Sequence, residues 1–379
     1  MRWILKRLLF AAILSVLAAE PLFAADRSFI SVSDIHFDPF QVCEDQPAPC
    51  PALTELEKAD VTQWKAIFAN HTEPAIQSGE DSGFNLLESS LQKIHNKAEE
   101  IHAEFALIPG DFLAHEFHEK YIHYSGSTSS RKYQAFVKKT LQFMRDEIHA
   151  ALPDISIYPL IGNNDSYTGD YQVVTDGLFL QDTQNTWATL LQDSAEKKAL
   201  LTTFAEAGYY ALTPAQWPML RIIALDTVLF STRGTGPDLD ASSLEQLAWL
   251  HDELLDAKVK GQRVLLVYHI PPGVDLLASL AAARPMPFWK LKYSRLFEQE
   301  VHQFQDNIVA VLPGHIHIDS LRFLFLKTTG PVPVYVTPSI SPIFGNNPSF
   351  KIFYFDPENF QIKKTATVVY DMDKSTWHE

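Results

Sequence analysis

Five segments of the sequence place aspartate, asparagine or histidine directly after an apolar run. In chain order these residues are Asp34 and His36, Asp111, Asn163 and Asn164, His269, and finally His315 and His317. Carboxylate, amide and imidazole ligands without a thiolate suit zinc, iron or manganese better than copper(I). Because the segments all follow apolar runs, we expect their side chains to meet in one metal site.

Each segment also has an ordinary explanation when it is taken alone. The Gly-Asn-Asn-Asp segment at residues 162–165 would form a turn, because glycine and asparagine tolerate positive φ. A single histidine such as His269 is commonly a buried, hydrogen-bonded imidazole. Asp34 and His36 lie at positions i and i+2, which point the same way in an extended chain, so we expect them to converge. The ordered set of five therefore favours a shared site over five unrelated turns.

Apolar runs alternate with helical patterns along most of the chain. We expect strands at residues 29–33, 105–108, 155–160, 221–225, 264–268, 308–312, 321–327, 332–336, 351–355 and 362–370. We expect helices at residues 85–104, 132–151, 184–206, 243–260 and 290–305. This alternation predicts a layered α/β sandwich in a single domain over residues 26–379. The polar segments follow the strands at their carboxyl ends, where open α/β sheets hold their ligands.

The composition describes an acidic globular chain of 379 residues. Apolar residues make up 46%, so disorder and collagen-like repeats are not expected. Acidic residues outnumber lysine and arginine by 46 to 31, which gives a net charge of −15. A field of this sign repels polyanions, so a nucleic-acid duplex is not an expected partner.

The first 25 residues have the three-part layout of a secretory signal peptide. Arg2, Lys6 and Arg7 precede an apolar run at residues 8–19, and small residues follow at Ala24 and Ala25. An uncleaved membrane anchor is the alternative, although the run is shorter than the ~20 residues of a full span. We expect an exported protein, periplasmic or secreted, with no stable membrane insertion after signal cleavage.

The only two cysteines, Cys43 and Cys50, share one proline-rich loop. In an exported protein such an even pair typically forms a disulfide. Metal binding by the pair is the weaker alternative, because no histidine or further cysteine lies beside it in the sequence.

The ordered segments resemble the pattern of the calcineurin-like metallophosphoesterases, which is D-x-H, G-D, G-N-H-[D/E], H and G-H-x-H. The match runs from Asp34 to His317. Longer segments at residues 33–39, 110–115 and 337–348 resemble the acid sphingomyelinase-like phosphodiesterase branch, which includes polyphosphatases. The implied fold is α/β: a four-layer α/β-β/α sandwich with two mixed sheets.

The resemblance implies a centre of two divalent metal ions. It assigns Asp34, His36 and His317 to one metal, Asn163, His269 and His315 to the other, and Asp111 to a bridge between them. The branch favours zinc, and manganese and iron are the alternatives. The implied enzyme is a hydrolase that cleaves phosphodiester or phosphoanhydride bonds. Its nucleophile would be a hydroxide that bridges the two metals and attacks phosphorus in line with the leaving group.

The chain departs from the family pattern at Asn164, where the family has a histidine beside the phosphate and the leaving group. An amide donates a hydrogen bond but delivers no proton, and a lost general acid typically costs ~10²–10⁴ in rate. Phosphoanhydrides suffer least, because their leaving phosphate is a weak base. His115 matches a second histidine of the branch, four residues after the bridging aspartate, and is expected to contact phosphate or supply the proton.

The expected partner is a small phosphorylated substrate: a nucleotide, a phosphodiester or a polyphosphate. The sphingomyelinases of the branch carry a saposin-like segment before the catalytic core, whereas here residues 27–33 enter the first strand almost directly. A lipid phosphodiesterase is therefore an alternative, and a catalytically silent protein that binds metal or phosphate is another. Residues that would line a substrate cleft, or simply pack in loops, are Phe37, Tyr167, Tyr171, Phe344 and Phe350.

Overall fold

A computed structural model describes residues 26–44, 46–324 and 330–379, so the expected signal peptide at residues 1–25 lies outside the described part. Within that part, a first sheet has the strand order β12-β11-β10-β1-β2-β3. Its strands are β1 (Arg27–Ser31), β2 (Phe105–Ile108), β3 (Ser156–Pro159), β10 (Ser349–Phe355), β11 (Ile362–Asp371) and β12 (Thr376–His378). β1, β2 and β3 run parallel, and β10 pairs with β1 antiparallel, so this sheet is mixed.

A second mixed sheet has the order β4-β5-β6-β7-β9-β8. Its strands are β4 (Tyr210–Leu212), β5 (Leu220–Leu225), β6 (Arg263–Tyr268), β7 (Ile308–Pro313), β8 (Ser320–Leu324) and β9 (Val332–Val336). β5, β6 and β7 run parallel, whereas the edge strands β4 and β8 are antiparallel to their neighbours.

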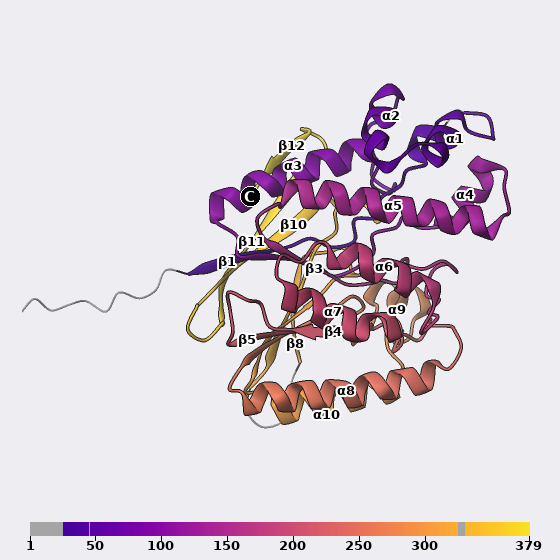
Figure 1. Cartoon of the computed structure of the whole chain (residues 1–379). Helices are drawn as coiled ribbons and strands as arrows, with labels where there is room; N and C mark the ends of the chain where they lie inside the picture. The colour runs from indigo at the N-terminus through magenta and orange to yellow at the C-terminus, as the bar shows by residue number, and fades with distance from the viewer. Residues whose placement is uncertain (1–25, 45, 325–329) are drawn as a thin grey trace, which may run out of the picture.

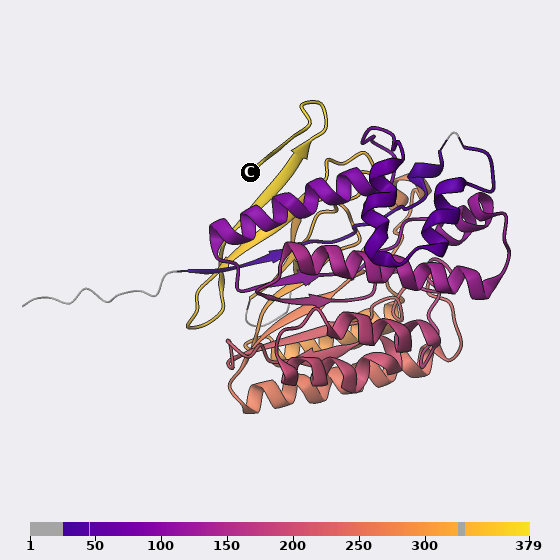
Figure 2. The ribbon, with the colours of Figure 1, turned by 45° about the horizontal axis from the view of Figure 1, so that its top comes forward.

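Helices cover the outer faces of both sheets. The α-helices of the described residues are α1 (Pro51–Lys58), α2 (Trp64–Asn70), α3 (Phe84–Ile101), α4 (Phe117–Ser125), α5 (Ser130–Ala151), α6 (Leu178–Ala188), α7 (Ser194–Ala207), α8 (Leu239–Val259), α9 (Leu276–Ala282) and α10 (Leu291–Phe304). In Figure 1, α3 and α5 lie on one side of the sheets, and α8 and α10 lie on the other. The turned view of Figure 2 keeps the same layers and puts the C-terminal strands beside α3. The predicted four-layer sandwich is confirmed.

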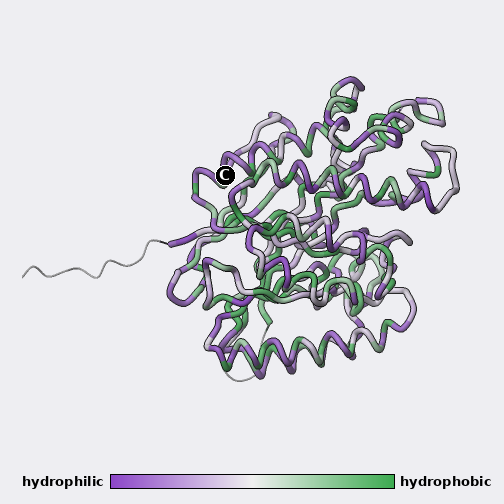
Figure 3. The backbone as a smooth tube through the Cα atoms, viewed as in Figure 1, coloured by the Kyte–Doolittle hydropathy of each residue, from purple (hydrophilic) through white to green (hydrophobic). Residues whose placement is uncertain are grey.

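The period-two alternation of the strands divides the core into two parts. Ile222 and Ala224 of β5 pack with residues of the first sheet, whereas Ile223 and Leu225 pack with the second cluster, which contains Leu250 of α8. β6 alternates in the same way, so both faces of the second sheet are apolar and buried. Figure 3 shows the green, hydrophobic stretches concentrated in the strands between the helical layers.

The predicted elements are largely correct, with informative exceptions. The expected helix at residues 184–206 is two helices, α6 and α7, because Asp193 caps the start of α7 by accepting hydrogen bonds from the backbone of Ala195 and Glu196. The predicted helix at residues 85–104 ends at Ile101, because His102 adopts a left-handed conformation. The short elements β4, β12, α1, α2, α4 and α9 were not predicted. The end of the expected strand 321–327 lies outside the described residues.

The predicted disulfide between Cys43 and Cys50 is confirmed, with the two Cα atoms 5.7 Å apart. Cys50 also caps α1, since its sulfur accepts a hydrogen bond from the backbone of Leu53. Across the part of the chain that the structure describes, no helix has both the length and the apolar content that a membrane crossing requires.

Candidate metal centre

The chain segments that follow β1, β2, β3, β6 and β7 carry all seven predicted metal ligands. They form two compact groups: Asp34, His36 and His317 make up the first group, and Asp111, His269 and His315 make up the second. Within each group, the candidate ligand atoms all lie within 4.8 Å of one another. The seventh residue, Asn163, joins the second group, because its Oδ1 lies 3.1 Å from His269 Nε2.

The first group is fully buried and tightly connected. Asp34 Oδ1 lies 3.3 Å from His317 Nε2, and the Nε2 atoms of His36 and His317 are 3.2 Å apart. The Asp34 carboxylate also accepts hydrogen bonds from Ser33 Oγ at 2.5 Å and from the backbone of His315 at 3.0 Å. These bonds fix the carboxylate and leave its remaining lone pairs directed at the histidines.

Asp111 lies between the two groups. Its Oδ2 is 3.1 Å from His269 Nε2 in the second group and 3.5 Å from His36 Nε2 in the first. Asn164 holds this carboxylate with two hydrogen bonds, from its backbone N–H at 2.8 Å and from its side-chain amide at 2.9 Å. The geometry matches the expected bridging position of Asp111. The two hydrogen bonds from Asn164 hold the Asp111 carboxylate in this position.

Backbone carbonyl groups determine which histidine nitrogens face the site. His36 Nδ1 lies 3.0 Å from the carbonyl oxygen of Leu113, and His269 Nδ1 lies 2.6 Å from that of Pro109. Each Nδ1 therefore donates its proton to a carbonyl group, and the neutral His36 ring directs its Nε2 lone pair toward the carboxylates of Asp34 and Asp111. Acceptor atoms then face acceptor atoms, an arrangement that bound cations would satisfy. The donor set thus fits metal ions.

The charge states of the first group also fit cation binding. Burial lowers the pKa of His36 to about 4, so its imidazole is neutral near pH 7. Burial alone would raise the pKa of Asp34, but His317 and His269 hold it well below its usual range. Asp34 and His36 therefore offer an ionised carboxylate and a neutral imidazole, which are the ligating forms.

The second group has a different balance of charge. Burial and the neighbouring His269 lower the pKa of His315 to about 3. Burial would lower the pKa of His269 as well, yet the adjacent Asp111 and Asp34 raise it to about 10. A cation that binds at His269 would therefore displace a proton.

The backbone at these residues differs from the expected extended chain. Asp34, His36, Asp111, His315 and His317 all have positive φ, between 46° and 71°. Asp34 and His36 do converge as predicted, but they do so through left-handed conformations. Such conformations are unfavourable for residues with a Cβ atom, and they cluster at functional sites where surrounding contacts enforce them.

Two glycines allow the loops after β2 and β3 to approach closely. A Cβ atom on Gly162 would lie 2.1 Å from Asp111 Oδ1, and one on Gly110, whose φ is +94°, would lie 2.6 Å from the backbone nitrogen of Gly162. Asp165 ties the same loops together by accepting backbone hydrogen bonds from Gly162 and Asp111. Glycine at residues 110 and 162 is therefore a steric requirement of the site.

Asp81 belongs to the site but was missed by sequence reasoning. It holds His115 twice, through the backbone N–H at 2.8 Å and through Nδ1 at 3.0 Å. The His115 ring stacks on His36 with the centroids 4.1 Å apart. Burial would lower the pKa of His115, but the bond and charge of Asp81 raise it. Asp81 lies in the connection before α3, and no spacing pattern links it to the other segments.

The aromatic candidates divide into core and site residues. Phe37 and Phe350 are fully buried in the core, so packing explains both. Phe344 is 65% exposed and presents its ring against His317 and His115, with centroids 4.7 and 5.6 Å away. The Tyr171 hydroxyl lies 3.3 Å from His315 Nε2. Phe344 and Tyr171 therefore flank opposite groups of the centre.

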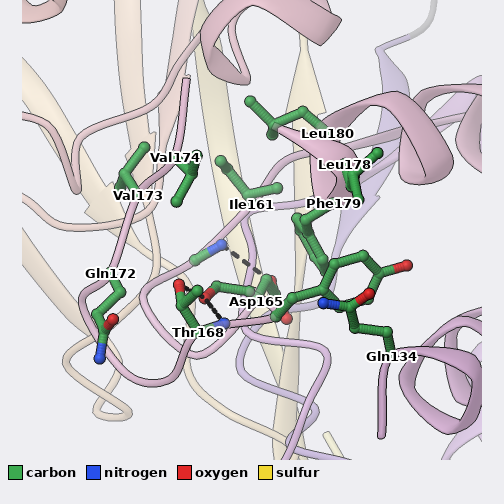
Figure 4. Close-up of a pocket in the computed structure, with 13 residues that line it drawn as sticks. Gln134, Ile161, Asp165, Thr168, Gln172, Val173, Val174, Leu178, Phe179 and Leu180 are labelled. Carbon is green, nitrogen blue, oxygen red and sulfur yellow. Dashed lines mark hydrogen bonds between the residues drawn. The ribbon is translucent and has the colours of Figure 1, made fainter. Parts of the chain in front are cut away.

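Tyr167 lines a separate pocket of about 220 Å³. Figure 4 shows Leu178, Phe179 and Leu180 facing Ile161 across this pocket, with Asp165 at its base. The pocket shares Gly162 and Asp165 with the metal-site loop. Burial and the charge of Asp111 raise the pKa of Asp165 to about 7. Asp165 therefore lines the apolar pocket and also holds the backbone of Asp111 in the metal centre.

The comparisons with known proteins find phosphodiesterases among the relatives and a phosphatase among the solved structures. No protein-family model matches the chain. The chain is 24% identical over 346 residues to the human cyclic GMP-AMP phosphodiesterase SMPDL3A, covering 88% of this chain and 68% of that protein. It is 23% identical over 384 residues to the human acid sphingomyelinase-like phosphodiesterase 3b, covering 98% and 76%.

Two further matches are a slime-mould protein and a solved structure. Identity to the sphingomyelinase phosphodiesterase D of Dictyostelium discoideum is 30% over 226 residues, and the match spans 57% of this chain but only 47% of that protein. A dimetal phosphatase from Danio rerio shares the fold with a TM-score of 0.51 at 12% identity, covering 92% of this chain and all of that one.

The named phosphodiesterase relatives, the dimetal phosphatase fold and the two groups of candidate ligands support a metal-dependent phosphoesterase of the hydrolase class. The chain is similar to the acid sphingomyelinase-like branch of the calcineurin-like metallophosphoesterases.

Proposed function

We propose that this chain is an exported hydrolase that cleaves phosphodiester or phosphoanhydride bonds of small phosphorylated substrates. The observation that carries the proposal is the arrangement of Asp111, whose Oδ2 faces His36 at 3.5 Å and His269 at 3.1 Å. A single buried carboxylate between two imidazole groups is the arrangement that a pair of cations requires, because it offsets their mutual repulsion.

The ligand assignment follows the two groups. Asp34, His36 and His317 would hold one metal, Asn163, His269 and His315 the other, and Asp111 would contact both. Bound there, the cations would activate water for attack on phosphorus and neutralise charge on the phosphoryl oxygens. We propose zinc as the native metal, with manganese and iron as alternatives, because nitrogen and oxygen ligands without thiolate accept all three.

The protein's own residues divide the remaining tasks. Asn164 donates both of its hydrogen bonds to Asp111, so we assign it the positioning of that carboxylate. We assign His115 as the proton donor to the leaving group, because its ring stacks on His36 and its side chain remains 28% exposed. Asp81 orients His115 and stabilises its charged form.

Export is proposed on two grounds. Residues 1–25 have the layout of a signal peptide. The Cys43–Cys50 disulfide is typical of proteins that mature in an oxidising compartment.

A specific surface feature favours lipid phosphodiesters as a second candidate substrate class. On α9, Leu276, Leu277 and Leu280 are 64 to 70% exposed. This helix lies on the excursion that leaves β6 after His269 and returns at Phe288, whose ring contacts His315. Sedimentation with phosphatidylcholine–sphingomyelin vesicles tests this candidate. Co-sedimentation of the wild type that is lost in Leu277→Ser would support a lipid substrate. Absence of vesicle binding by the wild type would rule it out.

The deciding experiment measures metal content and turnover together. Mature protein reconstituted with zinc or manganese is assayed on an aryl phosphodiester, ATP, polyphosphate and micellar sphingomyelin. The proposal expects two metals per chain and metal-dependent turnover that is lost in His269→Ala. His302→Ala, an exposed histidine on α10, is the matched control. Two bound metals without turnover of any substrate would instead favour a silent metal- or phosphate-binding protein.

A further inference from the structure

The loop after β5 lies beside the metal centre, although the sequence motifs assign it nothing. Arg233 of this loop is 68% exposed along its side chain. Its guanidinium carbon lies 4.0 Å from the centroid of the Tyr171 ring, which is the geometry of a cation–π contact. In a chain with a net charge of −15, this cation has a defined place next to the site.

Two separate contacts connect Arg233 with the second group of ligands. The Tyr171 ring under the guanidinium directs its hydroxyl to His315 Nε2 at 3.3 Å. Asp170 accepts a hydrogen bond from Arg233 Nη2 at 3.4 Å with one oxygen, and from the Asn163 side chain at 2.7 Å with the other. Arg233 is therefore linked to two proposed ligands through one intervening residue each: to His315 through Tyr171, and to Asn163 through Asp170.

Backbone hydrogen bonds fix the position of the loop that carries Arg233. Tyr171 donates a backbone hydrogen bond to Asn163 at 2.8 Å and accepts one from Thr235 at 2.9 Å. Val173 donates to Thr235 at 3.0 Å. These bonds join the loops after β3 and β5, so Arg233 and Asn163 keep a fixed relation even though the guanidinium itself is exposed.

A guanidinium in this position suits an anion beyond the one held at the metals. Its planar fork matches the geometry of phosphate oxygens, and stacking on Tyr171 orients the fork while its edge N–H groups stay available. A simple phosphodiester has one charged phosphoryl group, which the metals would occupy. A phosphoanhydride brings a second charged phosphate directly attached to the first.

We propose that Arg233 is a binding residue for the phosphate adjacent to the reacting phosphoryl group, which makes phosphoanhydrides such as nucleoside triphosphates and short polyphosphates the preferred substrate class. This inference rests on the proposed hydrolase function and specifies its substrate. It also agrees with Asn164, because an anhydride needs no strong proton donor for its leaving group.

The test compares Arg233→Ala, Arg233→Lys and wild type on ATP and on bis(p-nitrophenyl) phosphate, all metal-loaded. We expect Arg233→Ala to raise KM for ATP by about 5- to 30-fold more than KM for the diester, as for loss of a partly exposed charge-assisted hydrogen bond. Arg233→Lys should retain part of the ATP preference, because it keeps charge without the fork. Arg295→Ala, an exposed arginine on α10, is the matched control and should behave as wild type.

Titration calorimetry provides a readout that does not depend on turnover. Arg233→Ala should weaken binding of an ATP analogue in which methylene groups replace both bridging anhydride oxygens more than binding of AMP, by a similar factor. Equal losses for both ligands, or unchanged affinity for this analogue, would overturn the inference. Failure of wild type to hydrolyse either substrate would instead count against the proposed function, so the two failures are distinguishable.

Discussion

The two sides of the metal centre use the same ligand types but differ in their surroundings. Beside the first group, His115 stacks on His36 and is held by the buried Asp81. Beside the second group, Arg233 stacks on Tyr171 and pairs with Asp170. One side therefore offers a proton and the other a positive charge.

This difference separates two kinds of leaving group. An alkoxide must be protonated as it leaves, so an ester substrate depends on the side of His115. A leaving phosphate needs its charge met, so an anhydride substrate depends on the side of Arg233. Variants that disable one side at a time therefore show which substrates the centre is built for.

The largest effect is expected where the two sides meet, in Asp111→Asn. An amide cannot supply the charge that both cations would share, so turnover of every substrate should fall well beyond the ~10–100-fold typical of outer-shell partners. Metal analysis should also find fewer than two ions per chain. Asp240→Asn, an exposed carboxylate on α8, is the control. Full metal content with near-normal turnover would contradict the bridging assignment.

The next largest effect should be selective for one side. His115→Ala removes the proposed proton donor, so kcat for an alkyl phosphodiester should fall by ~10²–10⁴. The loss on ATP should be much smaller, and metal content should stay unchanged. Asp81→Asn should follow the same selectivity with a smaller loss, because His115 remains but is no longer oriented by a carboxylate. Equal losses on ester and anhydride would show that His115 supports the fold of the site instead.

Only some of the residues on the two sides of the metal centre could be predicted from the sequence. The polar segments could be placed at one edge because each follows an apolar strand, and the family resemblance then singled out the seven ligand candidates. Asp81 could not, because the structure alone brings it to His115, 34 residues further along the chain. The left-handed backbone at Asp34 and His36 was equally hidden, since contacts between loops impose it. Arg233 carries no local signal, and its position depends on pairing between the loops after β3 and β5.

A moderate gain of function is expected from Asn164→His, which restores the family residue. The imidazole would return a proton donor to the leaving group, so the ratio of ester to anhydride turnover should rise by about tenfold, below the full ~10²–10⁴ of a general acid because His115 already contributes. Stability should fall slightly, because the side-chain hydrogen bond from Asn164 to Asp111 is lost. The same substrate pair used for His115→Ala measures this ratio. An unchanged ratio would mean that His115 already satisfies the ester leaving group.

The smallest effect is expected for the stability of the region around the second group. Asp226, a buried carboxylate that directly follows β5, interacts with His269, and burial raises its pKa to about 7. An aspartate has a pKa near 3.9 when unfolded, so between about pH 4 and 7 the folded state holds a proton that the unfolded state has lost. Its contribution to stability is therefore fully present below pH 4 and is lost as the pH rises through 7. Asp226→Asn should flatten that decline by up to about 1.4 kcal/mol per pH unit. Urea unfolding of both proteins at pH 5 and 8, at one metal concentration, checks it, because ligand-linked changes common to both cancel in the difference. If the free energy of unfolding changed equally with pH in both proteins, Asp226 would be ionised in the folded protein, and a buried negative charge would lie beside the second group.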